Sequence, residues 1–184
     1  HSAILINFDL ANLAETFVSD LNNSVFSSTS NYKVYLKLFD VGEASTRPKD
    51  YNVKLSVLKD SINFEEGIGS DLYNFSDVGF ANFSKIDATN NWTNMSSVSQ
   101  DDCAPNYYLF KNQRDLISKG NEDITFDITS YFNDYLNGNV QSSSFIVRFD
   151  LDNLFDEYTY FVKRLGSVHL NNRSSHPRVE VHID

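Results

Sequence analysis

Apolar and polar residues alternate with a period of two along much of this chain. Such alternation is typical of β-strands that have one face in a protein core and the other in water. We predict a strand in each of six segments: Ile4–Leu10, Lys33–Leu38, Tyr51–Val57, Asp123–Ile128, Phe145–Phe149 and Arg178–Ile183. The repetition predicts an all-β fold.

One segment shows helical spacing instead. Thr129 is placed to cap a helix, and Phe132, Tyr135 and Leu136 would share one face of it. Gly138 can adopt the left-handed conformation that ends many helices. The pattern therefore predicts one short helix, which would close one end of the fold.

Between residues 65 and 100 the alternation breaks down into glycine, asparagine and serine with isolated aromatic residues. Long loops in a compact domain are usually functional, because a rigid scaffold can display them without depending on them. We find no internal repeat and no linker-like composition. We therefore predict one domain over residues 1–184, a β-sandwich of jelly-roll type with one short helix and long loops.

Charge and composition exclude several classes of partner. The formal net charge is −10 and the basic residues form no run, so the electrostatic attraction that drives nucleic-acid binding is missing. No apolar stretch approaches 18 residues, so we expect no membrane span. Cys103 is the single cysteine and cannot form an internal disulfide.

The candidate catalytic and metal-binding groups are weak. The spacing of the histidines near the end of the sequence does not match zinc-ligand pairs. The acidic run Asp150–Glu157 differs from the pattern of a calcium-binding loop. Two acidic residues precede Cys103 and would raise the pKa of its thiol. Glu65 and Glu66 have the residue type of glycosidase acids but no supporting motif. We expect no catalytic residues, no metal and no cofactor, hence not an enzyme.

Aromatic residues offer a second kind of site. Trp92, Tyr107 and Tyr108 lie in the long middle loops, and Tyr35 points outward between Lys33 and Lys37. Aromatic faces can stack on the apolar face of a sugar, although aromatic residues in β-proteins more often pack in the core. Glycan binding by these side chains therefore stays open beside a core role.

The order of segments resembles a family. An opening strand at residues 3–10, an acidic glycine-containing stretch at 65–69, a tryptophan segment at 91–93, the segment 123–129 and a closing strand led by Pro177 follow one another. This order is similar to that of the disaggregatase-related and DNRLRE-type jelly-roll domains. The resemblance implies a jelly-roll module used on a surface, in virions or in cell-surface proteins that bind carbohydrate. Apart from that tryptophan segment, residues 70–110 do not share the resemblance.

The end of the chain, residues 160–181, resembles the C-terminal segment of β-sandwich structural proteins in tailed-phage particles. That resemblance implies a virion protein, a capsid decoration, neck or tail component, which assembles with itself and with neighbouring capsid, neck or tail proteins. Lys163, Arg164 and Arg173 concentrate positive charge in this segment of an acidic chain, so we predict that they contact the partner. The alternative is a carbohydrate-binding module of an extracellular or cell-surface protein.

Overall fold

The computed structural model describes most of the chain, and the elements below lie within that part. The described residues are 3–27, 31–42, 51–66, 80–82, 84–93, 100–104, 110–111, 119–149 and 163–184. Among them no helix is long and apolar enough to cross a membrane. The predictions for Tyr107, Tyr108 and Asp150–Glu157 fall outside these residues.

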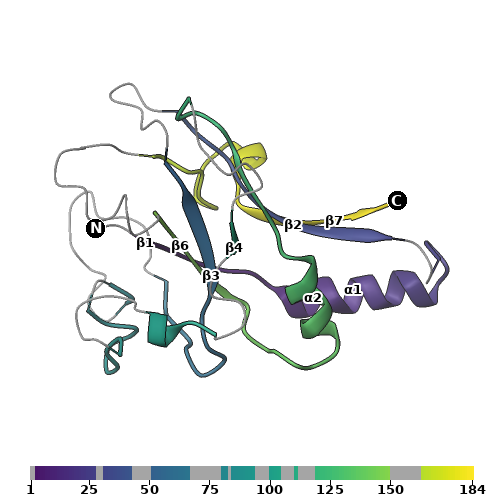
Figure 1. Ribbon diagram of the computed structural model, residues 1–184, viewed down its shortest axis with the longest axis horizontal. Coiled ribbons are helices and arrows are strands. Elements are labelled where there is room, and N and C mark those ends of the chain that lie inside the picture. The colour runs from purple at the N-terminus through teal and green to yellow at the C-terminus, as the bar shows by residue number, and fades with distance from the viewer. Residues whose placement is uncertain are drawn as a thin grey trace.

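Seven strands form two antiparallel sheets within the described part of the chain (Figure 1). One sheet has the order β1-β6-β3-β4 and the other has the order β5-β2-β7. The strands are β1 (Ala3–Asn7), β2 (Tyr32–Leu38), β3 (Val53–Val57), β4 (Phe110–Lys111), β5 (Ile124–Asp127), β6 (Ser144–Phe149) and β7 (Arg178–Ile183). All six predicted strands are present, and the short β4 was not predicted. The chain is β-rich, as its alternation indicated.

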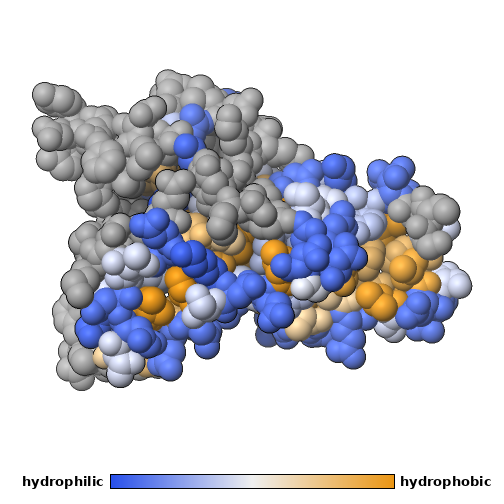
Figure 2. Space-filling view, turned by 60° about the horizontal axis from the view of Figure 1, so that its bottom comes forward, coloured by the Kyte–Doolittle hydropathy of each residue, from blue (hydrophilic) through white to orange (hydrophobic). Residues whose placement is uncertain are grey.

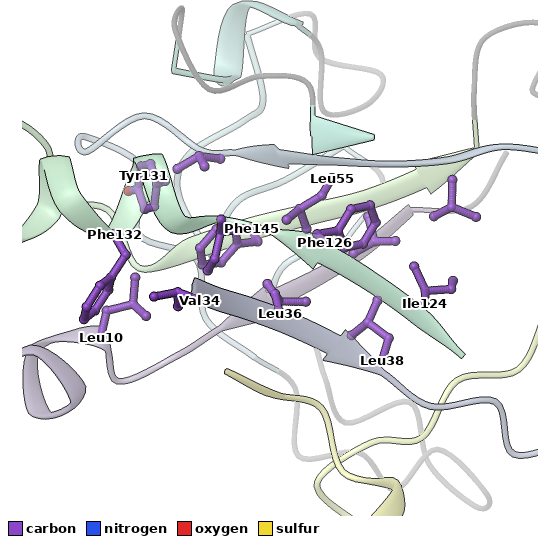
Figure 3. Close-up of a cluster of buried hydrophobic side chains, with 14 of the residues drawn as sticks. Leu10, Val34, Leu36, Leu38, Leu55, Ile124, Phe126, Tyr131, Phe132 and Phe145 are labelled. Atoms are coloured by element: carbon purple, nitrogen blue, oxygen red, sulfur yellow. The ribbon is translucent and has the colours of Figure 1, made fainter. Parts of the chain in front are cut away.

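Both sheets contribute to one hydrophobic core (Figure 3). Val34, Leu36 and Leu38 point into it from β2, while Leu55 and Phe145 reach it from β3 and β6 of the other sheet. These side chains are fully buried, as the period-two pattern predicts for the inward phase of each strand. The outward residues Lys33, Tyr35 and Lys37 of β2 are not buried.

A smaller hydrophobic cluster holds the middle loops. Trp92 is buried there with Leu58, Phe64, Cys103 and Ile146. The indole Nε1 of Trp92 donates a hydrogen bond to the Asn82 carbonyl at 2.8 Å, so its polar atom is satisfied inside the protein. This indole anchors the loop that contains it.

The first helix corrects the prediction of a single helix. Helix α1 (Leu10–Asn22) follows β1 directly, and the Asp9 carboxylate caps it by accepting from Asn12 N at 3.0 Å. The predicted strand over residues 4–10 therefore ends at Asn7. Leu10, the last residue of that alternating run, instead begins the helix and is buried in the core.

The second helix confirms the predicted position and corrects its cap. Helix α2 spans Thr129–Leu136, and Gly138 follows with φ of +73°. Thr129 is the first helical residue and not the cap: its backbone N donates to Asp127 Oδ1 at 3.0 Å, while its hydroxyl oxygen accepts from Val34 N. The helix start is thus fixed to the end of β5 and to β2.

Two short 3-10 helices complete the described elements. They are η1 (Gln100–Asp102) and η2 (Arg173–Ser175). Figure 2 shows that the visible surface is a mixture of hydrophilic atoms and separate hydrophobic patches. Exposed large hydrophobic side chains occur at the edges of both sheets, at Ile4 on β1 and at Ile183 on β7.

Candidate functional site

The outward face of the β5-β2-β7 sheet gathers charged side chains that pair with one another across the three strands. β2 and β7 pair antiparallel with Lys33 opposite His182, Tyr35 opposite Glu180 and Lys37 opposite Arg178. Because alternate residues of a strand point to one side, these six side chains share the face that lies away from the core. We call them, together with Asp127 of β5, the polar face.

Glu180 is the centre of the polar face. Its carboxylate accepts hydrogen bonds from Lys37 Nζ at 2.5 Å and from Arg178 Nε at 2.6 Å. It also lies 2.8 Å from His182 Nε2. The Lys37 and Arg178 hydrogen bonds lower the pKa of Glu180 to about 2, against the opposing effect of partial burial. The carboxylate is therefore ionised and held in place throughout the physiological pH range.

The other side chains of the polar face are also cross-linked. Lys33 Nζ lies 3.3 Å from Asp127 Oδ2, and the Tyr35 and His182 rings meet edge to face with centroids 5.1 Å apart. The Arg178 guanidinium lies over the Phe39 ring at 4.2 Å. Partial burial opposes ionisation of Asp127, but hydrogen bonds from Thr129 and Lys33 leave its pKa below the usual value.

Three permanent cations and two carboxylates make the polar face net positive in a chain of net charge −10. Positive charge therefore also gathers on the polar face, outside the segment 163–173 in which it was predicted. A charged surface of this kind can pair with complementary charges. Its carboxylates are committed to ion pairs, which leaves them poorly suited to proton transfer.

Lys163 does not lie on the surface as a partner contact would. Its side chain is 4% exposed, and its Nζ lies 2.5 Å from Asp40 Oδ2. The same ammonium donates to the carbonyl oxygens of Gly120 at 3.1 Å and Glu122 at 2.7 Å. All three of its donors are used inside the protein, so Lys163 is a structural cross-link between three segments.

This buried cation has a polar neighbourhood. Burial first, and then the Glu122 and Asp40 carboxylates, raise the pKa of Tyr51 above its ordinary value. The phenol is therefore neutral, and Lys163 supplies the positive charge that balances Asp40. The cluster stabilises the end of β2 and the approach to β5.

The segment after Lys163 is held close to the rest of the chain. Val41 N donates to the Arg164 carbonyl at 3.2 Å, and Gly166 N donates to the Phe39 carbonyl at 2.9 Å. A Cβ on Gly166 would lie 1.9 Å from the Ser175 carbonyl oxygen, so only glycine fits. The segment is thus held against residues 39–41, and its Gly166 packs against its Ser175.

Arg164 and Arg173 are exposed, as a partner-contact role requires. Arg173 begins η2, where the Asn172 side chain accepts from Ser174 N at 3.2 Å. Arg178 of the polar face donates to the Ser174 carbonyl at 3.0 Å, which joins this segment to the polar face. Two of the three cations predicted to contact a partner are therefore at the surface, and the third, Lys163, is buried.

Trp92 is 1% exposed, so its ring is packed by protein atoms and is not available for sugar stacking. The Thr93 hydroxyl and backbone N both donate to the buried Asp102 carboxylate, at 2.5 and 3.1 Å, which fixes the loop next to it. Tyr35 is half-buried on the polar face beside His182. Of the described aromatic residues considered for glycan binding, Tyr35 is the one that is not buried.

The remaining candidate groups do not assemble into a reactive site within the described ranges. No group of three or more His, Cys, Asp or Glu side chains in that part of the chain could hold a metal ion. Glu65 and Glu66 are exposed. Burial is the largest influence on Cys103, and it raises the pKa of the thiol.

Sequence reasoning missed the polar face because its members lie far apart in the chain. The outward phases of residues 33–37 and 178–182 were each visible, but only the β2-β7 register brings them together. A signal was present in the sequence: the alternating charged residues Arg178, Glu180 and His182 can form cross-strand pairs with an antiparallel strand that carries lysine residues.

Comparisons with protein-family models, with curated proteins and with solved structures find no match for this chain.

Proposed function

We propose that this chain is a structural protein of a tailed-phage particle, a capsid decoration, neck or tail component that acts through protein-protein assembly. The observation that carries the proposal is the polar face, where ion pairs lock charged side chains onto rigid strands. Such a surface is preorganised for a partner and loses little side-chain entropy on binding. The resemblance of residues 160–181 to phage β-sandwich proteins supports the particle as its location.

We also propose that the two sheets form a jelly-roll sandwich. The support is the shared core, to which β2 and β5 contribute from one sheet and β3 and β6 from the other. Inner faces of two sheets that interdigitate in this way are the basis of sandwich folds. A sandwich of this kind would present the polar face outward and leave both edges of the β5-β2-β7 sheet near the surface.

The experiment that tests the phage proposal is quantitative mass spectrometry of purified particles of the virus that encodes the chain. We expect peptides of this chain in a fixed copy number per particle that survives a moderate salt wash. Copy number should fall in particles that carry Arg178→Glu, because this change reverses one charge of the polar face. Detection in infected cells but not in purified particles would contradict the proposal.

A carbohydrate-binding module is the alternative, and the half-buried Tyr35 ring on the polar face is the observation that favours it. A glycan array with the purified chain and with Tyr35→Ala separates the two functions. Glycan binding that Tyr35→Ala abolishes would favour the module. A blank array with both proteins would leave the assembly proposal as the remaining one.

A further inference from the structure

Among the described strands, β7 is an edge strand with an open side. It pairs with β2 on one side, and in the part of the chain that the structure describes no strand pairs with its other side. Asp184 N donates to the Asn31 carbonyl at 2.9 Å and so continues the β2-β7 ladder. Because backbone groups alternate between the two sides of a strand, Val179, Val181 and Ile183 direct their N–H and C=O groups to the open side.

Open edges usually carry features that prevent pairing, such as lysine, proline or a bulge. The outward-bonding positions of β7 hold valine and isoleucine, which favour strand pairing. The Ile183 side chain is 42% exposed, although it lies on the side of the sheet that packs against the core. The edge is therefore both able to pair and incompletely covered.

The sequence of β7 is complementary to itself in one antiparallel register. In a two-fold symmetric pair, outward-bonding residues must face one another, so the pair centres on residue 180, 181 or 182. Centring on Glu180 places that carboxylate against itself, and centring on His182 places Glu180 against Asp184. Both registers bring like charges together, which is unfavourable.

The register centred on Val181 brings unlike groups together. It places Arg178 opposite Asp184 and Glu180 opposite His182 on the polar face. It also places Val179 opposite Ile183, and Val181 opposite its own copy, on the apolar side. The charged pairs are then non-hydrogen-bonded pairs, in which side chains approach most closely.

We propose that β7 pairs antiparallel with β7 of a second copy of this chain, centred on Val181, and joins two β5-β2-β7 sheets into one. This pairing deepens the proposed assembly function, on which it rests, by naming the contact between copies. It would cover Ile183 with the partner's Val179 and make the two polar faces continuous. The edge strand β1 differs, since Ala3–Asn7 carries no charge that could select a register.

Cysteine cross-linking tests the register directly. Opposed residues in a non-hydrogen-bonded antiparallel pair have Cα atoms about 4.5 Å apart, which brings their side chains close enough for a disulfide. Under mild oxidation, Arg178→Cys and Asp184→Cys should form a covalent dimer when they are mixed. Neither variant should cross-link when it is alone. The buried native Cys103 is present in all variants, and the unmodified chain serves as the control.

Two lysine variants test the edge without relying on disulfides. Ile183 and Ile4 are similarly exposed, at 42% and 40%, but lie on different edge strands, β7 and β1. In sedimentation velocity, Ile183→Lys should weaken self-association at least tenfold, whereas Ile4→Lys should leave it unchanged. Thermal unfolding should be similar for both variants, because each replaces an exposed side chain.

Absence of a mixed Arg178→Cys and Asp184→Cys dimer, or equal cross-linking of each variant alone, would overturn the β7 pairing. Self-association that survives Ile183→Lys would also overturn it, while leaving assembly through another surface intact. Conversely, β7 cross-links in a chain that is missing from purified particles would retain the pairing and refute the phage function.

Discussion

Replacing Lys163 with methionine should reveal how much the buried ion pair stabilises the fold. The change keeps the length and apolar stem of the side chain but removes the ammonium. Asp40, which is 12% exposed, would then hold an uncompensated carboxylate, and the carbonyls of Gly120 and Glu122 would lose a donor. Removal of one partner from a buried ion pair costs about 3–5 kcal/mol.

We expect the lower end of this range, about 3 kcal/mol, because Asp40 keeps a hydrogen bond from Gly42 N and retains some contact with solvent. For a chain of this size, each kcal/mol lowers the Tm by roughly 2–4 °C, so the expected shift is about 6–12 °C. Urea titration followed by circular dichroism measures the free energy of unfolding, and a thermal scan gives the Tm.

Lys33→Met is the matched control. Lys33 pairs with Asp127 at the surface, where its side chain is 56% exposed, and such pairs contribute roughly 0–1 kcal/mol. The double variant Lys163→Met with Asp40→Asn should be more stable than Lys163→Met alone, because it removes the unbalanced charge. Equal destabilisation by Lys163→Met and Lys33→Met would refute the reasoning.

Three further predictions follow from single side chains. The pKa of Glu180 is lowered to about 2 from an ordinary value near 4.3, so the ionised carboxylate stabilises the fold above about pH 4.5 and this stabilisation is lost as the pH falls toward 2. The Tm difference between the wild type and Glu180→Gln should shrink over that pH range. A constant Tm difference would contradict the stabilising role of the Glu180 ion pairs. Trp92 is the single tryptophan and is buried, so its fluorescence should be blue-shifted, resistant to iodide quenching and unchanged by polysaccharide; strong quenching would show that the indole is accessible. Gly166→Ala should destabilise the chain by roughly 1–3 kcal/mol, because its Cβ would collide with the Ser175 carbonyl. Gly138→Ala, whose Cβ meets open space, should cost about 1–2 kcal/mol through its positive φ alone. Amide exchange near Gly166 should become faster only in Gly166→Ala, which would show that the destabilisation arises at that contact.

β2 and β5 were predictable because each has one buried face. Their inward residues are buried almost completely and their outward residues are not, so a period of two was imprinted on the sequence. β4 has two residues, which is too short to show a period. Local alternation therefore gave the positions of the longer strands, while pairing order required the three-dimensional structure.

Helix α1 was missed although its pattern was present. Leu10, Leu13, Ala14 and Phe17 follow helical spacing, and Asp9 precedes them as a cap. The alternating run from Ile4 overlaps the start of the helix, so Leu10 fits both periods. Because the inward side chains of β1 and α1 pack against the same core, alternation continued past the end of the strand.

The site was predictable only in part, because charge in the sequence does not reveal burial. Lys163 and Arg164 are adjacent, yet the first is buried against Asp40 and the second is exposed. Trp92, in a loop rich in polar residues, is likewise buried. Both outcomes depend on contacts between segments that are distant in the sequence, which residue type and local spacing do not encode.

The mass of the purified, unmodified chain in solution tests assembly most directly. Light scattering over a wide concentration range would measure it at moderate salt. We predict a species of at least twice the chain mass of 21.0 kDa, with a fraction that rises with concentration. A mass of 21.0 kDa at every concentration would contradict the view that this chain acts by pairing with its own copies.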